Sequence, residues 1–327
     1  MTQSFEWGCA PHPSPSGEQR SLDRPEAQAR QLDRRSFLVA GAGALAFAAC
    51  GGGSSSAKPG SSGSSSPTST TATRPAWNLA AFNDFESLVP GSPQRLTFGL
   101  ADKDGVLVAT PPVSEMTMSI SLDGQPVGTP VTSAKHDSGL SRPYFPLVFT
   151  PPSAGVYTVS TTIEGATVER QVQIPATSKG IQPGQPMVPL DTPTTTDRRG
   201  VELLCTRSPA CPLHDITLRD ALTKGTPVAF LVATPQFCQT AICGPVLDVF
   251  LNVRPEFPQV TFLHSEVYPS VAAAQPGAQQ TVEAITTYNL FFEPWLLLAR
   301  PDGSVHRRLD VIFDEVELRD ALTQLAA

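Results

Sequence analysis

The stretch FCQTAICGP, residues 237–245, contains two cysteines separated by four residues and followed at once by Gly-Pro. The apolar run PVAFLVA (227–233) precedes it, and an uninterrupted apolar run with β-branched residues is typical of a strand buried on both faces. After it, in PVLDVFLNV, apolar residues recur at the spacing of a helix. The two cysteines are therefore predicted to lie where a buried strand passes into a helix.

The remainder of the C-terminal part predicts an alternation of strands and helices. QVTFLHSEVY (259–268) and WLLLA (295–299) are apolar runs expected to be buried strands, and TVEAITTYNL (281–290) between them has helical periodicity. After a turn at Asp-Gly, SVHRRLDVI (304–312) is expected to be the last strand. Asp314, with a glutamate three residues later, forms a capping-box pattern that predicts the start of the final helix.

This order of elements resembles the thioredoxin superfamily, and the likeness covers residues 201–327. Two motifs carry the resemblance: Cys238 and Cys243 between a strand and a helix, and Pro294 directly before a strand. The resemblance implies an α/β thioredoxin-like fold and a cis Pro294 that faces the cysteines. It also implies thiol-disulfide exchange at Cys238 and Cys243.

The spacing of the cysteines departs from the family pattern, which has two intervening residues where this chain has four. We expect Cys238 to be the attacking thiol, because its position after the strand matches the family, and Cys243 to resolve the mixed disulfide. The alternative is that the helix begins at the Cys-Gly-Pro of Cys243 and that this thiol attacks. In either case, unpaired N–H groups at the helix start would lower the pKa of a nearby thiol.

Glu293, which directly precedes Pro294, is a candidate for proton transfer, because the strand VAFLVA (228–233) lacks the buried acid found in the family. The competing interpretation is an ordinary solvated loop acid. No cofactor and no metal are predicted. Copper-delivering relatives use a distal histidine in the segment that corresponds to NLFFEP (289–294), which has none, and His264 is interpreted as a buried histidine at the edge of the core.

The N-terminal segment has the features of an export signal. Arg34 and Arg35 precede Ser-Phe-Leu and resemble the twin-arginine signature, and a short apolar run follows. That run ends in FAAC, which resembles a bacterial lipobox with Cys50 as the lipidated residue. Residues 1–49 are therefore predicted to be a cleaved signal peptide, and residues 50–76, rich in Gly and Ser, a lipidated and disordered tether. The alternative is an uncleaved anchor or an apolar stretch of a core.

Export would place the remaining cysteines in an oxidising compartment, where an even number favours two disulfides. Four cysteines allow three pairings, and the sequence does not choose among them; the local pairs are the simplest. Cys205 and Cys211 are expected to form a structural disulfide that staples a loop. Cys238 and Cys243 would, in the competing interpretation, also form an inert disulfide in a domain that binds without catalysing.

Residues 77–175 are predicted to be short strands separated by turns. MTMSISLDG (116–124) alternates apolar and polar residues and closes on Asp-Gly, and VYTVSTTIEGATVERQVQI (156–174) gives two alternating runs joined at Glu-Gly. Such a pattern predicts a β-sandwich of roughly seven strands. PPSAGVYTV resembles an edge of immunoglobulin-like domains, with Tyr157 in the tyrosine role, and His136 is expected to be a solvated loop histidine.

The Pro- and Thr-rich residues 176–200 are predicted to be a linker. A formal charge of -7 without a basic stripe gives no reason to expect nucleic-acid binding. The predicted architecture is an all-β immunoglobulin-like sandwich followed by an α/β thioredoxin-like domain. We expect a monomer anchored through the lipid on Cys50 at the extracytoplasmic face of the cell membrane. The predicted function is thiol-disulfide exchange with the thiols or disulfides of exported proteins; the alternative is a binding lipoprotein without enzymatic activity.

Overall fold

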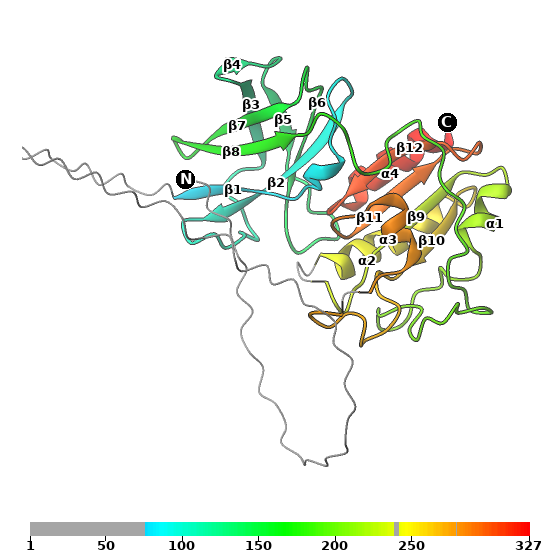
Figure 1. Cartoon of the computed structure of the whole chain (residues 1–327). Helices are drawn as coiled ribbons and strands as arrows, with labels where there is room; N and C mark the ends of the chain where they lie inside the picture. Colours follow the sequence, from blue (N-terminus) through cyan, green and yellow to red (C-terminus); the bar gives the residue numbers. More distant parts are fainter. Residues whose placement is uncertain (1–75, 239–241, 279) are drawn as a thin grey trace, which may run out of the picture. The chain divides into compact units, whose positions relative to one another are not determined.

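The computed structural model describes residues 76–238, 242–278 and 280–327 (Figure 1). Arg34, Arg35, Cys50 and nearly all of the predicted tether lie outside the described residues. The described chain belongs to one compact unit that extends from Ser69 to Ala327. Within that described part, none of the helices has the length and the apolar character needed to cross a bilayer.

The first region of the unit is built from strands alone, apart from one short 3-10 helix, η1 (Phe85–Ser87). One antiparallel sheet has the strand order β1-β2-β6, and a second has the order β4-β3-β7-β8, with β5 also paired to β3. The strands are β1 (Trp77–Ala81), β2 (Gln94–Asp102), β3 (Glu115–Leu122), β4 (Gln125–Pro126), β5 (Val131–Ala134), β6 (Phe145–Phe149), β7 (Gly155–Ile163) and β8 (Ala166–Ile174). These eight strands compare with the roughly seven that the sequence predicts.

Alternation of apolar and polar residues places the core of this region between the two sheets. In β3, Met116, Met118 and Ile120 are buried while the residues between them are exposed. They belong to the same apolar cluster as Phe98 of β2 and Leu147 of β6. Because side chains on a strand alternate between its two faces, β3 contributes one face to this shared core.

The second region, from about residue 201, mixes strands and helices. Its sheet has the order β10-β9-β11-β12, in which β10 is parallel to β9 and β11 is antiparallel to both β9 and β12. The elements are α1 (Leu218–Thr223), β9 (Val228–Val232), α2 (Cys243–Val253), η2 (Arg254–Glu256), β10 (Thr261–Ser265), α3 (Glu283–Tyr288), β11 (Trp295–Ala299), β12 (Val305–Asp310) and α4 (Glu315–Ala326). The described part of the chain as a whole is rich in β-structure, with few helices.

Helices cover both faces of this four-stranded sheet. All five residues of β9 are buried, as the apolar run predicts. Leu231 contributes to a cluster that includes side chains of α2 and α4, whereas Phe230 contributes to another that includes side chains of α1 and α3. A strand with apolar packing on both sides has no need of polar alternation, which explains the uninterrupted apolar sequence.

The final helix is capped by the residue that the sequence indicates. The Asp314 carboxylate accepts a hydrogen bond from the Glu317 backbone N–H at 2.9 Å, and such a cap contributes about 1 kcal/mol. The Glu317 side chain pairs with Arg95 of β2, with 2.5 Å between Oε1 and Nε. Burial raises the pKa of Glu317, but the charge and hydrogen bonds of Arg95, together with the Tyr144 hydroxyl and the charge of His136, outweigh burial, so the pKa is lowered.

Two segments have surroundings that differ from those expected. His136 is not a solvated loop histidine: its Nδ1 lies 2.9 Å from Asp314 Oδ1, and this hydrogen bond is the main reason that the His136 pKa is raised. The expected linker, residues 176–200, packs along the second region, where Met187 and Leu190 are buried in the cluster with α1 and α3. The Pro-rich sequence correctly predicted that residues 176–200 lack helices and strands, but a lack of regular structure does not prevent a segment from being buried.

Candidate functional site

The first cysteine pair lies where β9 leads into α2, as the sequence predicts. Cys243 is the first residue of α2, and its backbone N–H donates to Cys238 Sγ over 3.3 Å. A helix-terminal N–H directed at sulfur favours the thiolate form. Residues 239–241 between the cysteines lie outside the described part of the chain. All four described cysteines are present as thiols.

The two thiols of this pair differ in exposure. Cys243 is 0% exposed, whereas Cys238 is partly exposed. Burial raises the pKa of Cys243, with a further contribution from the hydrogen bond to Cys238, so this thiol is held neutral. The helix does begin at Cys243, which is the premise of the alternative assignment. The exposure of the sulfur atoms nevertheless favours Cys238 as the thiol that a protein client can reach.

Glu293 lies next to the buried thiol rather than in a solvated loop. The Cys243 S–H donates to Glu293 Oε2 over 3.5 Å, and the same oxygen accepts the Thr234 backbone N–H at 2.8 Å. Burial, followed by the negative charge of Cys238, raises the Glu293 pKa to about 8. A carboxyl group with a pKa near neutral pH is suited to exchange a proton with a neighbouring thiol.

The chain geometry before β11 explains how Glu293 reaches the cysteines. β11 pairs antiparallel with β9, with Trp295 opposite Val232, so Glu293 lies opposite Thr234 just beyond the strand ends. Pro294 links Glu293 to Trp295, the first residue of β11. The Glu293–Pro294 peptide bond is cis, as the resemblance implies. The preceding side chains Phe291 and Phe292 are 46% and 54% exposed.

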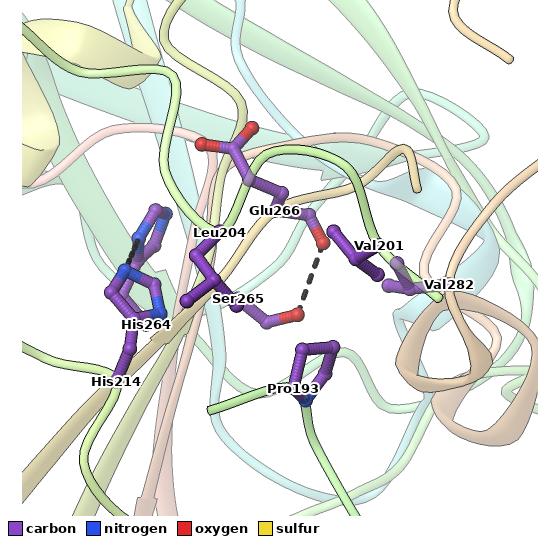
Figure 2. A pocket seen from close by; sticks show the side chains of 8 residues that line it. All are labelled: Pro193, Val201, Leu204, His214, His264, Ser265, Glu266 and Val282. Atoms are coloured by element: carbon purple, nitrogen blue, oxygen red, sulfur yellow. Dashed lines mark hydrogen bonds between the residues drawn. The ribbon is translucent and has the colours of Figure 1, made fainter. Parts of the chain in front are cut away.

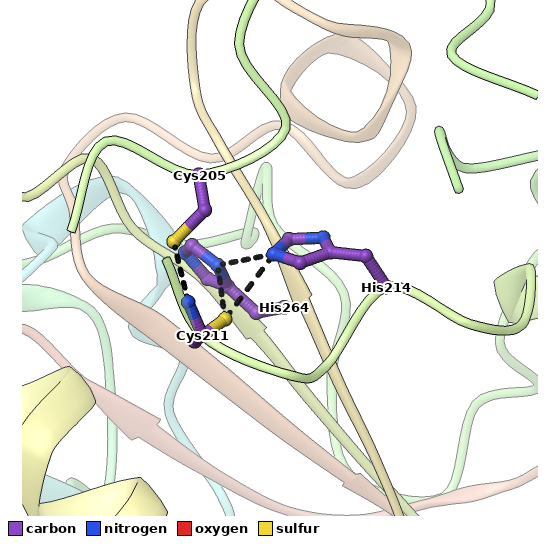
Figure 3. A group of neighbouring side chains, drawn as sticks. All are labelled: Cys205, Cys211, His214 and His264. Atoms are coloured by element: carbon purple, nitrogen blue, oxygen red, sulfur yellow. Dashed lines mark hydrogen bonds between the residues drawn. The ribbon is translucent and has the colours of Figure 1, made fainter. Parts of the chain in front are cut away.

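The second cysteine pair is brought together with two histidines (Figure 3). Cys205 and Cys211 belong to the loop before α1, His214 follows in the same loop, and His264 lies in β10. His264 is buried, as predicted. The association of His214 and His264 with the cysteines was not predicted; the spacing Cys-Pro-Leu-His at 211–214 was the available signal.

Thr234 lies between the two cysteine pairs. Its backbone N–H donates to Glu293, and its hydroxyl donates to Glu266 Oε2 at 2.6 Å. Glu266 also accepts the backbone N–H of Thr206, at 2.6 Å, in the loop that carries the second pair. Two buried or half-buried carboxylates are thus held by one threonine at the end of β9.

A small hollow adjoins the second pair (Figure 2). His214 and His264 lie on one side of it, and Val201 and Val282 on the other. Its volume is about 10 Å³, roughly the space of one water molecule. It is therefore too small to receive an organic substrate.

No family model matches this chain, and no curated protein matches its sequence.

Proposed function

We propose that Cys238 and Cys243 exchange thiols and disulfides with exported proteins. The observation that carries the proposal is the asymmetry of the pair: Cys238 is partly exposed and receives a helix N–H, while Cys243 is buried against Glu293. A redox pair needs one accessible thiolate that attacks and one protected thiol that resolves.

The same proposal assigns residues 201–327 to a thioredoxin-like domain. It is supported by the chain order β9-α2-β10-α3-β11-β12-α4 and by the strand order β10-β9-β11-β12. For residues 77–175 we propose an immunoglobulin-like sandwich. Two antiparallel sheets around one core support it, as does Tyr157, whose hydroxyl donates to the Ser153 carbonyl at 2.6 Å in the manner of a tyrosine corner.

In the proposed reaction, the Cys238 thiolate attacks one sulfur of a client disulfide. A Cys238–client disulfide forms, and the other client sulfur leaves as a thiolate. The Cys243 thiol then gives its proton to Glu293 and attacks Cys238 Sγ, which releases the second client thiolate. The client gains two electrons and the cysteine pair becomes a disulfide; the reverse sequence oxidises a client dithiol.

The test is to trap the intermediate with the full chain purified in detergent. Cys243→Ala should accumulate mixed disulfides with a disulfide-bonded reporter protein, because the resolving thiol is missing. Cys205→Ala is the matched control and should accumulate none. If Cys238→Ala traps the reporter and Cys243→Ala does not, the attacking thiol is Cys243.

The second candidate function is a binding lipoprotein in which both cysteine pairs are inert. Structural disulfides resist reduction at potentials above about -300 mV. A Cys238–Cys243 disulfide that stays oxidised at that potential, with no trapped intermediate in either variant, would establish this second function instead.

We further propose that the protein is a lipoprotein at the extracytoplasmic face of the membrane. The N-terminal sequence supports this through Arg34, Arg35 and Cys50. Two acyl chains give stable anchoring where one chain is marginal. Cys50→Ser should remove the lipid mass and release the exported chain from membranes; an unchanged mass and membrane fraction would refute the assignment.

A further inference from the structure

We propose that Cys205, Cys211, His214 and His264 bind one zinc(II) ion. The proposal is independent of the redox reaction assigned to the other cysteine pair. Figure 3 shows the two sulfur atoms and the two imidazole rings directed toward one another. One donor atom from each residue lies within 4.8 Å of all the others.

The distances between the donor atoms match those of a tetrahedral site. Cys211 Sγ lies 3.2 Å from His214 Nε2 and 3.4 Å from His264 Nδ1, and the two nitrogens are 3.4 Å apart. Zinc bonds of about 2.3 Å to sulfur and about 2.0 Å to nitrogen give tetrahedron edges of roughly 3.3–3.8 Å. Three edges are therefore already formed, and Cys205 closes the site with a shift of at most about 1 Å.

Hydrogen bonding prepares His264 for metal binding. Its Nε2 lies 3.0 Å from the Ala233 carbonyl oxygen, which accepts only from an N–H. The proton is therefore on Nε2, and Nδ1 presents a lone pair to Cys211 and His214. Metal-binding histidines commonly donate their second ring N–H to a carbonyl or carboxylate in this way.

The charge balance favours zinc over a monovalent ion. Two thiolates and two neutral imidazoles carry a charge of −2, which Zn²⁺ neutralises completely. Cys211, His214 and His264 are all buried, and a net charge in such a place is costly. Copper(I) also accepts thiolates, but it would leave one negative charge in the buried site.

A disulfide between Cys205 and Cys211 is the competing interpretation. It explains why the sulfurs are close, but not why imidazole nitrogens from His214 and His264, fifty residues apart, converge on Cys211. The Cys211 N–H donates to Cys205 Sγ over 3.4 Å, a contact that stabilises a thiolate ligand. Zinc binding would release the thiol protons and keep this pair out of disulfide exchange.

The experiment measures metal in the full chain, reduced, freed of metal and titrated with Zn²⁺. Wild type should bind one zinc per chain by elemental analysis. Cys211→Ser and His264→Gln should bind none, while Cys238→Ser and Cys243→Ser, the matched cysteine controls, should still bind one. Retention of zinc by Cys211→Ser would overturn the proposal.

A second measurement uses the wild-type chain, so it does not depend on the folding of any variant. Co²⁺ added to the reduced protein should give the intense d–d absorption of tetrahedral cobalt with a thiolate-to-cobalt charge-transfer band. One equivalent of Zn²⁺ should remove both. A reduced wild-type chain that gives only octahedral cobalt, or that binds copper(I) but not zinc, would refute the zinc site.

Discussion

The two cysteine pairs share a local arrangement but have different neighbours. In each pair one thiol is buried and the other partly exposed, and the backbone N–H of the buried cysteine donates to its partner sulfur, over 3.3 Å at Cys238 and 3.4 Å at Cys205. The buried Cys243 meets a carboxylate, whereas the buried Cys211 meets two imidazole nitrogens. Cysteine spacing alone therefore does not determine chemistry; the groups beside the buried sulfur do.

The chemical consequence follows from what each neighbour can accept. Glu293 can take a proton from Cys243, which makes that sulfur a nucleophile when it is needed. His214 and His264 offer lone pairs, which with two thiolates complete a cation site. The proposed redox reaction therefore depends on the first arrangement, and the proposed zinc site on the second.

The largest expected effect comes from removing the proposed attacking thiol. Cys238→Ser should lower the rate of disulfide exchange by roughly three orders of magnitude or more, because Cys243 is buried and Cys205 and Cys211 are held in the proposed zinc site. Reduction of a fluorescent disulfide reporter measures the rate, and the zinc content should stay at one per chain. The comparison breaks down if Cys205→Ser, rather than Cys238→Ser, abolishes exchange.

The next effect concerns stability supplied by the metal. Zinc that binds the folded chain only should add about 2.7 kcal/mol to the free energy of unfolding when free zinc is a hundred times its dissociation constant. Denaturant unfolding of the reduced chain with and without zinc measures this gain. Cys211→Ser should show no gain and Cys243→Ser the full gain; equal gains in both would place the metal elsewhere.

Glu293→Gln should slow the resolving step of exchange while making the folded protein more stable at pH 8. The wild-type resolving step should accelerate as the pH rises through about 8, where Glu293 becomes a proton acceptor, and the variant should be about a hundredfold slower at neutral pH. The pKa of Glu293 in the folded chain is raised above its ordinary value of 4.5, so wild type loses stability as the pH rises from about 4.5 to about 8. The variant should lack that loss and be the more stable protein at pH 8.

Stopped-flow decay of the mixed disulfide and denaturant unfolding at several pH values measure these two effects. Glu266→Gln is the comparison variant: Glu266 is a buried carboxyl group that bonds to the Thr234 hydroxyl, and its charge raises the Glu293 pKa less than burial and the charge of Cys238 do, so its effect on the pH profile should be smaller. An unchanged pH profile in Glu293→Gln would show that Glu293 is not the proton acceptor of Cys243. The proposed chemical difference between the two cysteine pairs would then have no basis.

Sequence periodicity predicted the first pair better than the second. The buried strand before Cys238 and the helix after Cys243 follow from the apolar patterns of one short stretch, whereas the expectation for Pro294 came from the family resemblance. The second cluster depends on the parallel pairing of β9 and β10, which brings His264 to a loop fifty residues earlier in the chain. The sequence around a single histidine in an apolar strand does not indicate which distant residues it will contact. The three-dimensional fold is needed to show that His264 meets the cysteines of the loop.

The smallest expected effect tests whether the two pairs are independent. Thr234→Val keeps the shape of the side chain and the backbone N–H to Glu293, but removes the hydroxyl that donates to Glu266 at 2.6 Å. Glu266 would retain its bonds to Thr206 and hold the Cys205 loop less firmly. Zinc affinity should fall about tenfold, as for other groups that support metal ligands, while the exchange rate changes by less than about twofold.

Competition with a chromophoric chelator measures the zinc affinity of Thr234→Val, and the reporter assay measures its exchange rate. Thr234→Ser, which keeps the hydroxyl, is the matched control and should bind zinc with the affinity of the wild type. If exchange falls as steeply as zinc affinity, the carboxylates on either side of Thr234 act as one coupled network. The two pairs would then be parts of a single site, because a change confined to one hydroxyl would have reached Cys243 through Glu293.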